Sequence, residues 1–195
     1  MENFTYMLSN NDCFIVIDPS WGFNEIVKYA QEKKKKLSAI FLTHGHFDHF
    51  MDTKKIISAF KDICVYICEK DLSFLDFKYD FKYVCDEQNI NICGIDIKVI
   101  HTPGHSEGSV CYLVGNNLFS GDTLFAGVCG RVDLPHSDPE KMRKSLIKLS
   151  NLSDDIIVWP GHDYERNMTT IGREKKENIF IKYAPDKDRF LSIAL

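Results

Sequence analysis

The feature that most constrains the fold of this chain is a set of polar side chains that each follow a short strand-like run. The apolar run 39–42 leads into Thr-His-Gly-His-Phe-Asp-His at residues 43–49. His105 and His162 each follow a Pro-Gly pair, and Asp122 follows Ser-Gly. Because glycine lets the backbone turn sharply, each strand end can aim its side chain at a common centre. The sequence therefore predicts one site built from several strand ends.

The residue types at these positions are typical of a divalent metal site, since imidazole and carboxylate groups bind zinc, iron and manganese. The candidate ligands are His44, His46, Asp48, His49, His105, Asp122 and His162. A single catalytic zinc takes three protein ligands and keeps one position for water. Seven ligands suit two ions, about 3.5–4 Å apart, that share a carboxylate and can hold a bridging hydroxide at neutral pH. His101 is expected to be structural or an outer contact, and the role of His136 stays open.

Hydropathy patterning predicts an α/β chain. Strands are expected at residues 4–8, 13–17, 39–42, 65–67, 95–100, 109–114, 118–120 and 156–159, and helices at 23–32, 52–60, 139–149 and 169–178. A short amphipathic piece is expected at 72–75, and Asp138 is a plausible N-cap for the helix that Pro139 opens. Two mixed sheets with helices outside would satisfy this pattern, although the pattern does not choose them over other α/β arrangements.

Length and composition place limits on the protein. The 195 residues suit one catalytic domain spanning 1–195. The net charge of −4 argues against a nucleic-acid partner, and no apolar run approaches the roughly 18 residues of a membrane span. The N-terminus shows no secretory signal. The seven cysteines are expected to be reduced, as in a cytoplasmic protein, and Cys13 and Cys111 to be buried.

Five segments give the chain a family resemblance. Residues 43–49 resemble the THxHxDH signature of the metallo-beta-lactamase superfamily, and residues 102–106 and 120–125 resemble its next two motifs in the expected order. Residues 130–135 (Gly-Arg-Val-Asp-Leu-Pro) resemble the GRxDLP segment of its glyoxalase II-like, or hydroxyacylglutathione hydrolase, branch. Residues 169–175 resemble the C-terminal helix of the same branch. The chain stops at Leu195, so it resembles the short, single-domain members of that branch.

The resemblance implies an αββα sandwich, with two mixed sheets and helices on the outer faces. It implies that His44, His46 and His105 bind a first metal ion, that Asp48, His49 and His162 bind a second, and that Asp122 bridges them. Asp48 and Asp122 are the expected catalytic carboxylates. Zinc is the preferred metal, with iron and manganese as alternatives.

The implied activity is hydrolysis of an S-acylglutathione-type thioester, a small-molecule substrate. A thiolate, whose conjugate thiol has a pKa near 8.5, leaves with little help from an acid. A persulfide dioxygenase of the same fold is the main alternative, with one iron on His44, His105 and Asp122. A nuclease of the superfamily and a metal-binding module without activity are further alternatives. Arg131 and Tyr164 are the expected substrate contacts, although Arg131 could instead pair with Asp133.

Overall fold

The strands at the centre of the molecule alternate their side chains between two faces, as β-strands must. In strand β2 (Cys13–Ile17), Ile15 and Ile17 pack among side chains of a second sheet. Phe14 and Val16 point the other way and pack among helix residues. The structure, a computed structural model, describes residues 3–195. Each sheet is therefore covered by the other sheet on one face and by helices on the opposite face.

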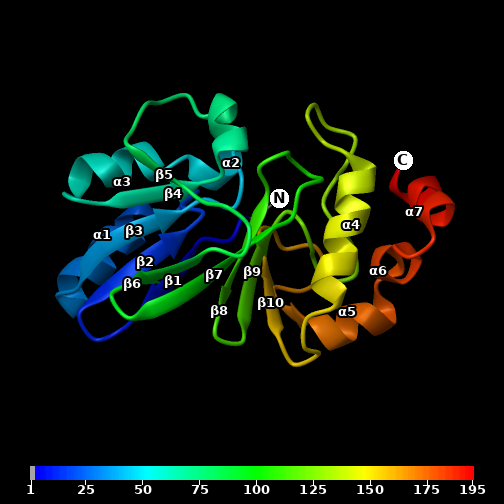
Figure 1. The fold of residues 1–195 in the computed structure, drawn as a ribbon. Helices are drawn as coiled ribbons and strands as arrows, with labels where there is room; N and C mark the ends of the chain where they lie inside the picture. The colour runs from blue at the N-terminus through cyan, green and yellow to red at the C-terminus, as the bar shows by residue number, and fades with distance from the viewer. Residues whose placement is uncertain (1–2) are drawn as a thin grey trace.

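The first sheet has the strand order β1-β2-β3-β4-β5, and β1 alone runs antiparallel to its neighbour. Its remaining strands are β1 (Tyr6–Ser9), β3 (Lys36–Phe41), β4 (Cys64–Ile67) and β5 (Phe81–Tyr83). Helices α1 (Phe23–Lys33) and α3 (Thr53–Ala59) cover its outer face (Figure 1). This half of the molecule is the left side of Figure 1.

The second sheet has the order β11-β10-β9-β8-β7-β6, in which only β9 and β10 are parallel to each other. Its strands are β6 (Asn89–Ile92), β7 (Ile95–His101), β8 (Val110–Val114), β9 (Asn117–Gly121), β10 (Ile157–Pro160) and β11 (Thr169–Thr170). The helices on its outer face are α4 (Pro139–Ser150), α5 (Ile171–Glu177), α6 (Ile179–Tyr183) and α7 (Lys187–Ala194) (Figure 1). The expected αββα sandwich with two mixed sheets is confirmed.

Most of the predicted elements are confirmed. The N-terminal hairpin, the buried strand before the histidine motif and the helix opened by Pro139 all form. The Asp138 carboxylate accepts a hydrogen bond from the backbone N–H of Lys141, at 2.9 Å, and caps α4 as expected. The piece near residue 72 is a 3-10 helix, η1 (Glu69–Phe74). None of the helices within residues 3–195 has both the length and the apolar character to cross a bilayer.

Two parts of the chain differ from the sequence-based expectation. Asp48 and His49 lie on a one-turn helix, α2 (Phe47–Phe50), which is not among the expected helices. The helix expected over 169–178 is shorter, since residues 169–170 form β11 and Thr170 caps α5. Asn178 then caps α6, with its side chain accepting from the backbone N–H of Phe180 at 2.9 Å. Caps of this kind divide a continuous helical pattern into short helices.

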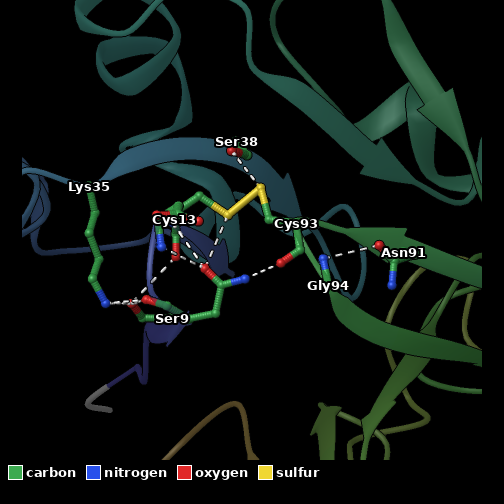
Figure 2. Close-up of a disulfide and its surroundings, with 9 residues drawn as sticks. Ser9, Cys13, Lys35, Ser38, Asn91, Cys93 and Gly94 are labelled. Atoms are coloured by element: carbon green, nitrogen blue, oxygen red, sulfur yellow. Dashed lines mark hydrogen bonds between the residues drawn. A yellow bond between two sulfur atoms is a disulfide. The ribbon is translucent and has the colours of Figure 1, made fainter.

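The expectation that all cysteines are reduced is wrong for one pair. Cys13, at the start of β2, forms a disulfide with Cys93 in the turn between β6 and β7 (Figure 2). The two Cα atoms are 6.5 Å apart, and the partners are separated by 80 residues in sequence, a pairing that spacing alone does not reveal. Cys13 and Cys111 are nevertheless buried, as expected. Since disulfides persist in oxidising compartments, the cysteines do not argue for a cytoplasmic location.

This disulfide ties the two sheets together, and we expect its loss to destabilise the protein. Closing a loop of this length removes entropy from the unfolded chain, so Cys93→Ser should lower the free energy of unfolding by about 2–4 kcal/mol. The measurement is urea unfolding with and without a thiol reductant. Cys85→Ser, which changes an exposed free cysteine, is the matched control. A reductant-insensitive midpoint in the unmodified protein would contradict the prediction.

Candidate metal centre

All seven predicted ligands converge on one end of the sandwich. His44 follows β3, Asp122 follows β9 and His162 follows β10, while His105 lies in the loop after β7. The remaining three, His46, Asp48 and His49, lie on or next to α2. Because the C-terminal ends of parallel strands meet at one edge, the turns after β9 and β10 place Asp122 and His162 side by side, with 3.2 Å between Oδ2 and Nε2.

The ligand atoms form three overlapping groups. In each group, the nitrogen and oxygen atoms lie within 4.8 Å of one another. The groups are His44, His46 and His105; His44, His49 and Asp122; and Asp48, His49 and His162. Asp122 touches both ends of the cluster, since its carboxylate is 3.5 Å from His105 Nε2 and 3.3 Å from His49 Nε2. This is the placement that a ligand shared between two ions would need.

Three of the imidazoles are oriented by acceptors behind them. His105 Nδ1 donates to the backbone carbonyl of Arg131 at 2.9 Å, and His49 Nδ1 donates to the carboxylate of Asp18 at 2.9 Å. His44 Nδ1 lies 3.1 Å from the hydroxyl of Thr43, which itself donates to Asp18. A proton on Nδ1 leaves the lone pair of Nε2 free, and in all three residues Nε2 faces the cluster. This is the arrangement by which proteins prepare histidines for a metal.

The packing of the cluster fits a cation. His46 Nδ1 lies 3.1 Å from His44 Nε2 and 2.9 Å from His105 Nε2. Three imidazole nitrogens, each with either a lone pair or a proton, are thus in close contact. Asp122 Oδ1 is buried and makes no hydrogen bond within residues 3–195. A buried oxygen without a partner costs about 1–3 kcal/mol, which a bound cation would remove. These residues therefore fit a divalent metal ion.

The charges around His49 also favour a positive charge at this place. Burial alone lowers the pKa of His49, but the carboxylates of Asp122 and Asp18 on its two sides raise it well above the ordinary value. Burial alone raises the pKa of Asp122, yet the neighbouring His49 and His162 hold it well below its usual range. Burial, reinforced by His49, holds the pKa of His44 well below its ordinary value, so that imidazole is neutral and available as a ligand.

Gly161 is required where β10 delivers His162 to the cluster. A Cβ atom at this position would collide with Asp122 Oδ1 and would approach His49 Cε1 to 2.7 Å. Any side chain here would therefore occupy the space between two ligands. The Pro-Gly-His pattern that the sequence shows at 160–162 is explained by this close approach.

Two buried carboxylates behind the ligands were missed by the sequence analysis. Asp18 accepts from His49, from the hydroxyl of Thr43 at 2.6 Å and from the backbone N–H of Thr43 at 2.8 Å. Asp18 directly follows the buried strand β2, and several proposed ligands likewise follow a strand end. This pattern could have identified Asp18 from the sequence. Asp71, on η1, is also fully buried. It accepts from the backbone N–H of Gly45 at 2.9 Å and of Gly108 at 2.7 Å, and from Ser106 Oγ at 2.6 Å.

A groove opens directly onto the cluster. It has a volume of about 440 Å³, and both expected substrate contacts, Arg131 and Tyr164, line it. The Arg131 guanidinium also makes two 2.9 Å hydrogen bonds to Asp133, so the ion pair that the sequence left as an alternative is present as well.

The remaining two histidines lie outside the cluster. His101, at the end of β7, bonds through Nε2 to the carbonyl of Glu107 at 3.0 Å, which fits the expected structural role. His136 packs edge-on against Phe74, with 5.5 Å between the ring centroids.

Several known proteins are similar to this chain. The sequence profile of the metallo-beta-lactamase superfamily matches residues 2–89 and 94–162. A hydroxyacylglutathione hydrolase of Francisella tularensis subsp. novicida is 36% identical over 167 residues, covering 84% of this chain and 64% of the relative. The chain thus spans less than two thirds of that relative's length.

Solved structures also share the fold, and two of them are informative. ETHE1 from Myxococcus xanthus has a TM-score of 0.86 and 26% identity, covering 98% of this chain and 84% of its own. TTHA1623, crystallised in a di-iron-bound form, has a TM-score of 0.79 and 30% identity, covering 90% of this chain and 93% of its own.

Proposed function

Because the chain belongs to the metallo-beta-lactamase superfamily, we propose that it is a thioesterase with two metal ions that cleaves S-acyl thioesters of the S-acylglutathione type. The observation that carries the proposal is the position of Asp122 between two ligand groups that open onto one groove. The hydroxyacylglutathione hydrolase relative supports the choice of a thioester, and the di-iron form of TTHA1623 supports two ions.

In this proposal, His44, His46 and His105 would hold one ion, Asp48, His49 and His162 would hold the second, and Asp122 would be a ligand to both. Bound there, divalent ions polarise a carbonyl and make water acidic enough to ionise near neutral pH. The His and Asp donor set suits zinc, iron and manganese, with zinc as the proposed resident metal. Asp18 keeps the proton of His49 on Nδ1, and the backbone carbonyl of Arg131 does the same for His105.

The reaction joins a water oxygen to the thioester carbonyl carbon and breaks the C–S bond, and sulfur leaves with the electron pair. Because the ordinary pKa of a thiol is near 8.5, the leaving thiolate needs little protonation. An amide or lactam nitrogen would need a proton from a neighbouring acid. The chain's own task is therefore to hold the carbonyl at the cluster and to leave the thiol side of the substrate open to water.

The direct test is release of free thiol from S-lactoylglutathione and from simple acyl thioesters by protein loaded with zinc, iron or manganese. We expect turnover that a chelator removes and that added metal restores. Absence of thiol release from every thioester with each of the three metals would contradict the proposal.

The structural likeness to ETHE1 supports one alternative, a dioxygenase with a single iron on His44, His105 and Asp122. The geometry counts against it, because the group that contains His44 and His105 is completed by His46. We expect His46→Ala to lose metal and thioester turnover together. Metal analysis and oxygen uptake with glutathione persulfide would check this. A His46→Ala protein that keeps its iron and consumes oxygen would favour the dioxygenase.

The acidic net charge counts against the nuclease alternative. Among the groove-lining residues within 3–195, Arg131 is the only arginine or lysine, and Asp133 already pairs with it. A phosphodiester backbone is normally bound by several such cations. We therefore propose a small-molecule substrate and no nucleic-acid partner.

A further inference from the structure

The groove beside the cluster is walled mainly by apolar side chains. Those lining it are Phe47, Phe74, Phe125, Leu134, Pro135 and Tyr164. Phe47 lies on α2 next to Asp48 and is 68% exposed, so the fold itself does not bury it. Large exposed apolar surfaces that line a concave site mark a place for an apolar ligand group.

These walls begin at the ligands themselves. The ring of Phe74 lies edge-on to His46, with 5.3 Å between centroids. On the other side, the ring of Phe125 lies 6.1 Å from His162 and 4.6 Å from Tyr164. Phe125 itself is 1% exposed, so the accessible apolar surface beside the ligands comes from Phe74 and from Tyr164, which packs on Phe125.

The groove itself offers few charged partners for the glutathione part of such a substrate. Glutathione carries two carboxylates and an ammonium group, which would need several complementary charges. Within residues 3–195, the only arginine or lysine that lines the groove is Arg131, whose guanidinium already makes two hydrogen bonds to Asp133. The groove is therefore suited to the acyl half of the substrate, and the thiol carrier is left outside it.

We propose that this groove selects thioesters by an apolar acyl group of several carbons, with little dependence on the thiol. The inference rests on the proposed thioesterase and extends it to the class of acyl group. Five of these six walls offer a hydroxylated acyl group such as lactoyl no hydrogen-bond partner, and the sixth, Tyr164, offers one phenolic hydroxyl. Each methylene that enters the groove should instead raise kcat/KM roughly fourfold.

The test uses one thiol, N-acetylcysteamine, carrying acetyl, butyryl, hexanoyl or lactoyl groups. We expect kcat/KM for hexanoyl to exceed that for acetyl on the order of 100-fold. Phe47→Ala, at an exposed position where folding is not at risk, and Leu134→Ala should reduce this ratio several-fold. Tyr83→Ala removes an aromatic ring of similar exposure on β5, outside the groove, and should leave the ratio unchanged.

A binding measurement gives a second readout. Ketone analogues in which CH₂ replaces the thioester sulfur are not hydrolysed, and calorimetry on the metal-loaded protein should show tighter binding of the hexanoyl analogue than of the acetyl analogue. Equal kcat/KM for all acyl groups, or a preference for lactoyl, would overturn the inference while leaving the thioesterase in place. Failure to cleave any of these thioesters would instead contradict the proposed function.

Discussion

We expect Asp122→Ala to lose bound metal and to lower thioester turnover by more than about 100-fold. Removing a residue that only supports a metal ligand typically costs up to about 100-fold in metal affinity or activity. Asp122 is placed as a ligand itself, so its loss should cost more. Its carboxylate lies 3.2 Å from His162 Nε2, 3.3 Å from His49 Nε2 and 3.5 Å from His105 Nε2. Alanine would leave these imidazoles facing each other with no carboxylate between them, so both proposed ions would lose a ligand.

Metal content per chain and thiol release check this prediction on the same preparation. Asp122→Asn keeps the shape but removes the negative charge, and we expect intermediate metal content. Asp80→Ala is the matched control, because the Asp80 side chain is 89% exposed and pairs with Lys82 on the surface. If Asp122→Ala kept two ions per chain and full turnover, the two-metal assignment would be wrong.

The positions of the proposed ligands could be predicted because they are set by local structure. His105, Asp122 and His162 each follow a glycine in a turn after a strand, and both the strand pattern and the glycine are visible in sequence. The end of a strand fixes the direction in which the next side chain points. A ligand motif directly after a predicted strand therefore also predicts where its side chains lie in the fold. The αββα arrangement, in contrast, came from the family resemblance, since periodicity alone does not specify how two sheets stack.

The parts that could not be predicted depend on contacts between distant residues. Asp18 and His49 are 31 residues apart, and Asp71 and Gly108 are 37 apart. No periodic pattern connects such pairs. The division of the C-terminal helices has a similar cause, because Asn178 caps α6 while its amide group also donates to the carbonyl of Val128, 50 residues away. One-turn α2 is too short to show a helical period.

Asp71→Ala should be the second most damaging change, although the hydrogen bonds of its carboxylate within residues 3–195 go to no proposed ligand side chain. Asp71 accepts a hydrogen bond from the backbone N–H of Gly45, which lies between His44 and His46. It also accepts one from the hydroxyl of Ser106, which follows His105. Its other oxygen accepts the N–H of Gly108 at 2.7 Å. One carboxylate thus fixes two ligand-bearing loops to each other. Asp71 is a positioning residue for the first of the two proposed ions.

Removing this carboxylate leaves the buried N–H groups of Gly45 and Gly108 without an acceptor, while the Ser106 hydroxyl still has Ser109 Oγ at 2.7 Å. We therefore expect the free energy of unfolding to fall by about 3–4 kcal/mol. Among molecules that remain folded, metal affinity should fall about 10- to 100-fold. Compared with alanine, Asp71→Asn should restore part of the stability and part of the metal affinity. The amide oxygen of asparagine can still accept a hydrogen bond, whereas its NH₂ group faces another donor.

Urea unfolding and metal titration on folded protein separate the two effects. Asp76→Ala, which removes an exposed carboxylate paired with Lys54 just after η1, should change neither quantity by more than about 0.5 kcal/mol. A loss of stability with unchanged metal affinity would make Asp71 structural only. A parallel loss, partly restored by asparagine, would show that the carboxylate sets the spacing between His46 and His105, whose facing nitrogens are 2.9 Å apart.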